Sequence, residues 1–95
     1  MLVSESGICS WYGQGLEGAL TANGEHFHPN ELTAAHKTLP FNTHVKVTID
    51  SLSVVVRIND RGPFVAGRIL DVSPAAADHL NLRNRGIAHC EVHTV

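Results

Sequence analysis

The sequence predicts a mainly β protein, a small and mostly antiparallel barrel with about six short strands, one or two short helices and many turns. Apolar and polar residues alternate over positions 45–49, which is the period of a half-buried strand. A mostly apolar run at 53–58 follows after a short break, and alternation returns at 87–95. Periodicity alone does not distinguish a barrel from a compact sandwich.

The first half of the chain reads as two strands joined by irregular segments. Residues 7–13 form a first strand that ends at a glycine, and the glycine-rich segment 13–18 is a loop. Residues 32–36 form a second strand. A turn is expected over 38–43, because Pro40 has no N–H to donate to a strand ladder.

The second half contains the clearer signals. Residues 50–52 make a short reversal into the strand at 53–59, and a further short strand covers 68–72. Ser73 and Pro74 mark a helix start, because serine is a good N-cap and proline is harmless at the first helical position. The last strand, 87–95, has its more apolar face at Ala88, Cys90, Val92 and Thr94.

Composition limits the functional classes. Ninety-five residues predict one domain over 1–95, and 43% hydrophobic with 17% charged residues is ordinary for a globular protein. A formal charge of −2 with only seven Lys and Arg argues against a nucleic-acid partner. No apolar run has a membrane-spanning length of about 20 residues, and the first seven residues lack a signal-peptide pattern. The sequence therefore predicts a soluble chain without a transmembrane segment or an export signal of its own.

Cys9 and Cys90 lie near opposite ends of the chain. A barrel often brings its first and last strands together, so the two thiols have one possible pairing in an oxidising compartment. Two buried free thiols fit the sequence equally well.

Seven histidines raise the question of a metal site. His26 and His28 would share one face of a strand, but no histidine forms a set with cysteines or carboxylates at a known zinc spacing. No metal and no cofactor is predicted.

Asp60 is the first candidate for chemistry. It follows an apolar strand, precedes Arg61-Gly62-Pro63, and shares period-2 parity with Val56 and Ile58, which predicts a partly desolvated carboxyl suited to general-acid work. Arg61 would oppose that effect. The alternative is that Asp60 only caps the turn after it.

Two further polar residues are candidates for a functional site. Glu25 follows the turn dipeptide Asn23-Gly24, and His36 follows an apolar segment where it would orient a carboxylate or bind a sugar hydroxyl. Their alternatives are a solvated surface carboxylate and a hydrogen-bonded core histidine. Tyr12 is a candidate ring for a sugar face, whereas Phe41 is expected in the core.

Five segments in order carry a family resemblance: 10–13 (SWYG), 21–25 (TANGE), 32–41 (LTAAHKTLPF), 54–64 (VVVRINDRGPF) and 67–73 (GRILDVS). Together they span most of the chain and resemble the rare lipoprotein A family. The resemblance implies a six-stranded double-psi β-barrel. It also implies a lytic transglycosylase, a lyase and not a hydrolase, that cleaves the bond between N-acetylmuramic acid and N-acetylglucosamine in peptidoglycan glycan strands and leaves anhydro-muramic ends.

The resemblance also implies a site and a location. Asp60 matches the family's acid/base, and Glu25 and His36 match its other functional positions. Substrate-binding positions are expected at Tyr12, Thr21, Asn23, Lys37, Asn59 and Arg61. The implied location is the cell envelope or the extracellular space, which is the periplasm in a Gram-negative bacterium.

Several departures from the family pattern keep other functions open. The reversal at 50–52 is shorter than the family's hairpin, and Cys9 and Cys90 stand where small or aliphatic residues are usual. One alternative is a non-catalytic glycan-binding or wall-loosening module similar to the expansin barrel. Another is a hydrolase that uses Asp60 together with Glu25 or Asp71.

Overall fold

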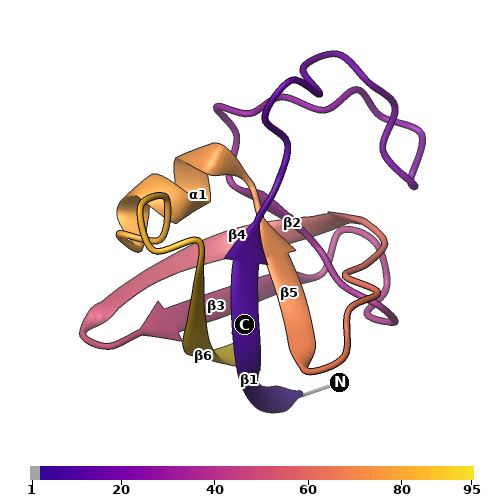
Figure 1. The fold of residues 1–95 in the computed structure, drawn as a ribbon. Coiled ribbons are helices and arrows are strands. Elements are labelled where there is room, and N and C mark those ends of the chain that lie inside the picture. The colour runs from indigo at the N-terminus through magenta and orange to yellow at the C-terminus, as the bar shows by residue number, and fades with distance from the viewer. Residues whose placement is uncertain (1–2) are drawn as a thin grey trace.

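The computed structural model describes residues 3–95 and shows a closed barrel with the strand order β1-β5-β2-β4-β3-β6 (Figure 1). The mainly β, six-stranded prediction is confirmed. The elements are β1 (Ser4–Trp11), β2 (Thr33–Ala35), β3 (His44–Ile49), β4 (Leu52–Asp60), β5 (Arg68–Val72), α1 (Pro74–His79) and β6 (Ile87–Thr94).

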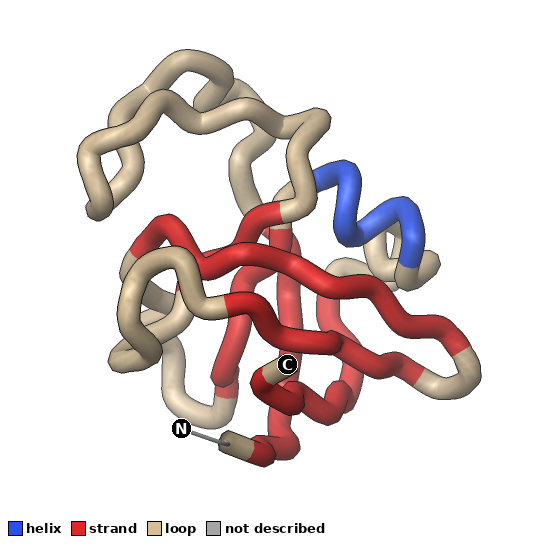
Figure 2. Tube along the Cα trace, turned by 180° about the vertical axis from the view of Figure 1, so that it is seen from behind, coloured by secondary structure: helices blue, strands red, loops and turns tan. Residues whose placement is uncertain are grey.

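Barrel neighbours are mostly distant in sequence. β1 pairs in parallel with β5 and β2 pairs in parallel with β4, whereas the other four strand pairs are antiparallel. The chain therefore leaves the barrel after β1 and returns only at β2. This long connection projects from one end of the barrel, next to α1, in both views (Figures 1 and 2).

The core is formed by the inward faces of the strands and by the helix. The alternating residues of β3 and β6 are buried as expected, including Val45, Val47, Ile49 and Val92. Aliphatic side chains are close-packed in such an interior, so truncation of one removes packing contacts from its neighbours. The predicted apolar face of the last strand is confirmed.

The helix begins where the sequence predicts. The Ser73 hydroxyl accepts the Ala76 N–H at 3.3 Å, and Pro74 occupies the first turn. The same hydroxyl donates to the Glu31 carbonyl at 2.6 Å. One serine thus caps α1 and fixes the end of the β1–β2 connection.

Cys9 and Cys90 form a disulfide between adjacent strands, with Cα atoms 5.8 Å apart. The antiparallel register of β1 and β6 pairs Gly7 with Cys90 and Cys9 with Ala88, which brings the two thiols together inside the barrel. The expectation of a bridge is confirmed, and the alternative of two free thiols is wrong.

Removing this bridge should destabilise the barrel. The Cys9→Ala/Cys90→Ala variant is expected to lose about 2–5 kcal/mol of unfolding free energy, because the bridge closes a long loop in the unfolded chain. Urea denaturation measures the loss, and reduced wild-type protein is the control. A double variant as stable as the oxidised protein would contradict the prediction.

Candidate active site

Asp60 is the last residue of β4, where a register irregularity sets its orientation. β4 pairs Ile58 with Ala34 and Asp60 with Ala35, so Asn59 is an extra residue between the two pairs. Such a bulge changes the direction in which the next side chain points. Ile58 and Ala34 belong to the core, Asn59 is buried, and Asp60 is half-buried. The expected parity of Asp60 with Val56 and Ile58 is therefore wrong, because it assumed an uninterrupted period of two.

Three donors hold the Asp60 carboxylate. The backbone N–H groups of Ala22 and Arg61 each donate to Oδ1 at 2.9 Å. The Tyr12 hydroxyl donates to Oδ2 at 2.9 Å. Ala22 lies in the β1–β2 connection, Arg61 directly follows β4, and Tyr12 directly follows β1. The Arg61 contact is the turn-capping bond expected of an aspartate, but it is one bond of three.

Tyr12 is kept as a hydrogen-bond donor. Burial raises the pKa of its phenol far above the usual value, and the nearby charges of Asp60 and Asp71 and the bond to Asp60 act in the same direction. The ring packs on Phe27 with centroids 5.3 Å apart. Gly13 has a φ of 107°, and a Cβ there would overlap the Phe27 ring, so this residue must be glycine.

Glu25 is held as an anion at the edge of the site. Arg57 donates from Nη1 to Oε1 at 2.8 Å and from Nη2 to Oε2 at 3.2 Å. Asn23 Nδ2 donates to Oε1 at 3.2 Å. The pKa of Glu25 is lowered, first by the Arg57 hydrogen bonds, against a smaller opposing effect of burial. A carboxylate paired with an arginine in this way stays ionised and is a poor proton donor.

The lowered pKa of Glu25 should depend on Arg57. In Arg57→Met the pKa should rise towards the ordinary value of about 4.3. Because the folded pKa is depressed, the stabilisation from this pair is present above the unfolded pKa and is lost as the pH falls through the lowered folded value. Carboxyl ¹³C NMR titration measures the shift. Arg85→Met, which removes the exposed pair with Asp50, is the control. An unchanged Glu25 pKa in Arg57→Met would reject the assignment.

The other predicted polar positions of the β1–β2 connection form a compact turn. Thr21 Oγ1 donates to Asn23 Oδ1 at 2.6 Å, and the Glu25 N–H donates to the same oxygen at 3.1 Å. The Asn23 N–H donates to the Asn59 carbonyl at 3.3 Å. This bond ties the turn to β4 one residue before Asp60, so Thr21, Asn23 and Asn59 position the donor at Ala22.

His36 and Arg61 lie on the other side of Asp60. The His36 N–H donates to the Asp60 carbonyl at 3.2 Å, whereas its ring contacts Glu5, Thr38 and Leu39. Arg61 donates from Nη1 to the His36 carbonyl at 3.2 Å, and its guanidinium lies 4.0 Å from the Phe41 ring centroid. The bonds recorded for His36 therefore reach Asp60 through the backbone. Lys37 is exposed, and Phe41, expected in the core, packs at its margin.

Sequence reasoning missed three supporting groups. Glu5 binds the His36 ring, Arg57 binds Glu25, and Arg68 donates to Asp71 Oδ1 at 2.8 Å, where the Ser10 hydroxyl also binds. For Arg57 a signal existed, since it is the one charged residue within the apolar run 54–58. Glu5 is brought beside His36 only by the pairing of β1, β5 and β2, which local sequence does not reveal.

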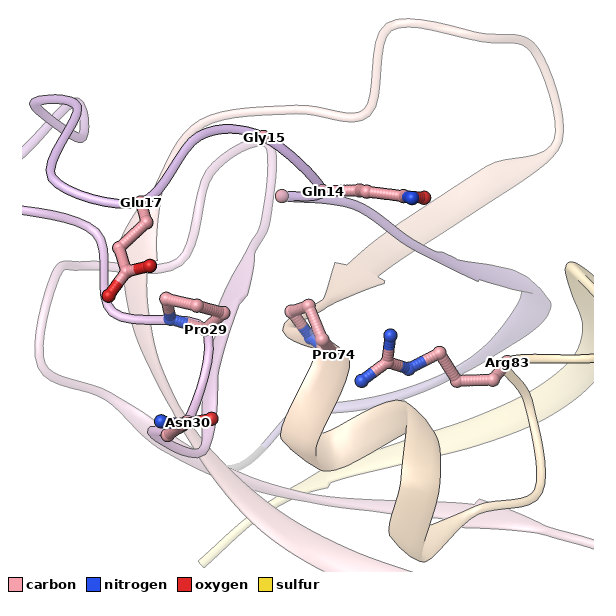
Figure 3. A pocket seen from close by; sticks show the side chains of 8 residues that line it. Gln14, Gly15, Glu17, Pro29, Asn30, Pro74 and Arg83 are labelled. Carbon is pink, nitrogen blue, oxygen red and sulfur yellow. The ribbon is translucent and has the colours of Figure 1, made fainter.

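A separate cavity of about 350 Å³ lies between the β1–β2 connection and α1 (Figure 3). Gln14 and Glu17 border it on one side, and Pro74 and Arg83 border it on the other. The Arg83 guanidinium stacks over Trp11 at 5.1 Å and pairs with Asp78. None of the predicted site residues lines this cavity, so it is separate from the candidate site at Asp60.

Metal and membrane features do not add to the site. Within residues 3–95, no three His, Cys, Asp or Glu side chains gather in an arrangement that would hold a metal ion. The described part of the chain also has no helix with the length and apolar character needed to cross a bilayer.

The strand order is that of a double-psi β-barrel, and the hydrogen-bonded Asp60 carboxylate lies at the end of β4. Two solved structures share the fold: the Streptomyces papain inhibitor, with a TM-score of 0.78, 18% identity and coverage of 98% of this chain and 96% of that one; and a Clavibacter michiganensis expansin mutant in complex with cellohexaose, with a TM-score of 0.79, 19% identity and coverage of 98% and 50%. At these identities the likeness shows the fold alone.

The chain belongs to the lytic transglycolase family, whose model matches residues 4–92. The probable endolytic peptidoglycan transglycosylase RlpA of Synechocystis sp. is 55% identical over 90% of this chain and 27% of that protein. The endolytic peptidoglycan transglycosylase RlpA of Campylobacter jejuni is 54% identical over 86% and 30%. The corresponding Neisseria meningitidis protein is 47% identical over 97% and 39%. The chain thus spans well under half the length of these curated relatives.

Proposed function

We propose that this domain is a peptidoglycan lytic transglycosylase, in which Asp60 acts as both acid and base on glycan strands. The observation that carries the proposal is the burial of the Asp60 carboxylate together with its hydrogen-bond partners. It is half-buried and held by three neutral donors, and none of the ion pairs in residues 3–95 includes it. Family membership and the names of the relatives support the same reaction.

In the proposed reaction one carboxyl group first gives a proton and then takes another. Protonated Asp60 gives its proton to the glycosidic oxygen between N-acetylmuramic acid and N-acetylglucosamine as the bond from that oxygen to the muramic C1 breaks. The resulting carboxylate then takes the proton of the muramic 6-hydroxyl, whose oxygen bonds to C1. The products are a free 4-hydroxyl and a 1,6-anhydro-muramic end, and no water is consumed.

The surrounding carboxylates support a single acid. A hydrolase that uses two carboxylates needs a second one that is able to activate water. Glu25 is committed to Arg57, and Asp71 is committed to Arg68 and Ser10. Neither is free for that role, which favours an internal hydroxyl over water as the nucleophile. A peptidoglycan substrate also implies a location in the cell envelope.

The test is product analysis on purified glycan strands. Wild-type protein should produce anhydro-muramic ends, and Asp60→Asn should lose at least about 10²-fold in turnover, as expected on removal of a general acid. Asparagine keeps an Oδ1 acceptor for Ala22 and Arg61, so the fold should survive. Reducing ends would show a hydrolase, and the absence of new ends would show an expansin-like binding module. Full activity in folded Asp60→Asn would refute the assignment of the acid.

Glu25 and His36 are proposed to position rather than to transfer protons. Glu25→Gln and His36→Ala should each cost less than Asp60→Asn, because the proton donor survives and only alignment suffers. Combined with Asp60→Asn, each should add little, since groups that act as one unit fail together. The same glycan assay measures both effects. If Glu25→Gln is inactive while Asp60→Asn retains substantial turnover, the roles are reversed.

A further inference from the structure

The strongest unassigned contact near Asp60 is the pair between Glu5 and His36. His36 Nε2 lies 2.6 Å from Glu5 Oε1, and the exposed fractions of the two side chains are 6% for His36 and 34% for Glu5. We propose that Glu5 is a positioning residue for the reaction at Asp60. It fixes the His36 ring and, through it, the Arg61 N–H that binds the Asp60 carboxylate. The kinetic part of this inference rests on the proposed function.

The contacts of the His36 ring determine where its proton lies. Nδ1 accepts the backbone N–H groups of Thr38 and Leu39, each at 3.0 Å. An imidazole nitrogen that accepts hydrogen bonds carries no proton, so in the neutral ring the proton is on Nε2. It is then donated to Glu5. The two N–H donors therefore select the tautomer, and the carboxylate on the second nitrogen fixes the ring orientation.

The fixed ring organises the segment after β2. Because Nδ1 holds two consecutive N–H groups, the turn after His36 is folded around the imidazole. The backbone of the same residue bonds both neighbours in the site, giving its N–H to the Asp60 carbonyl and accepting Arg61 Nη1 at its own carbonyl. A movement of His36 is therefore transmitted to the end of β4.

Arg61 connects this segment to the carboxylate. Its guanidinium is held between the His36 carbonyl and the Phe41 ring, and its own N–H donates to Asp60 Oδ1. If His36 moves, Arg61 loses a side-chain anchor next to the N–H that orients Oδ1. The path from Glu5 to Asp60 thus consists entirely of recorded contacts.

β1 consequently controls both oxygens of Asp60. Near its beginning, Glu5 acts through His36 and Arg61 on Oδ1. Just after its end, Tyr12 donates to Oδ2 directly. Without Glu5 the Nε2–H would have no recorded acceptor within residues 3–95, and an unmet donor at a largely buried position favours rearrangement of the ring. Glutamine at this position retains an acceptor oxygen, so Glu5→Gln should preserve the arrangement that Glu5→Ala loses.

NMR on the 95-residue chain tests the inference without substrate. Long-range ¹H–¹⁵N spectra should show the Nε2–H tautomer of His36 in wild type and in Glu5→Gln. In Glu5→Ala the Nε2–H resonance should shift or broaden, because its carboxylate acceptor is gone, and the Arg61 amide resonance should shift. Glu91→Ala is the matched control, because Glu91 and His93 form an exposed pair on β6 with a separation of 3.7 Å. An Arg61 amide that is unchanged in folded Glu5→Ala would overturn the proposal.

Kinetics on glycan strands give the second measurement. Glu5→Ala should lower kcat about tenfold with KM nearly unchanged, since misalignment affects the transition state more than binding. Glu5→Gln should restore most of the rate, and Glu91→Ala should behave as wild type. Glu5→Ala/His36→Ala should be no slower than His36→Ala, because both changes break one path. Additive losses, or an effect confined to KM, would overturn the positioning role.

The two arms separate the possible failures. If wild-type protein gives no anhydro-muramic ends, the proposed function fails while the NMR arm still decides whether Glu5 controls Arg61. If the ends form and Glu5→Ala is as active as wild type, only this inference fails. Glu5→Asp, which withdraws the carboxylate from Nε2 by one methylene, replaces Glu5→Ala in both arms should that variant not fold, with the same expected and contrary results.

Discussion

The pairing of β2 with both of its neighbours is the constraint on which the rest of the structure depends. This strand has only three residues, all buried, and it hydrogen-bonds to β4 on one side and to β5 on the other. Buried backbone groups must be paired, and a strand this short therefore fixes the registers of both neighbours. Ala35 lies opposite Asp60 and Asp71 at once. His36, the next residue, then lies beside the end of β4.

The four carboxylates around the site differ in the charge of their hydrogen-bond partners. Glu25 and Asp71 each have an arginine, Glu5 has a histidine, and Asp60 has neutral donors only. An arginine fork holds a carboxylate in its ionised form, whereas neutral donors orient the group without supplying an opposite charge. Asp60 thus differs from the other three carboxylates in having no positively charged partner among the recorded contacts.

Local sequence predicts most of this fold and part of the site. The alternations at 45–49 and 87–95 and the Ser73-Pro74 start are local signals, and the structure has the expected strands and helix there. The prediction that Asp60 shares a strand face with Val56 and Ile58 was wrong. The extra residue at Asn59 arises in the pairing with β2, and the strand's own pattern does not reveal it. Glu5 was missed for the same reason: its partner is 31 positions away. The ordered motifs supplied the candidate residues, and only the register shows how those residues are held.

The first and last strands of the barrel are hydrogen-bonded neighbours, with Ser4 opposite His93. Among the strands described in residues 3–95, no pair other than β3 with β4 joins elements that are consecutive in the chain. Contacts of such long sequence separation form slowly, because much chain entropy is lost before they stabilise anything. No fragment of this domain therefore contains a complete sheet, and Asp60, whose three donors come from positions 12, 22 and 61, has its geometry only when the whole barrel is closed. Folding and the assembly of the site are one cooperative event.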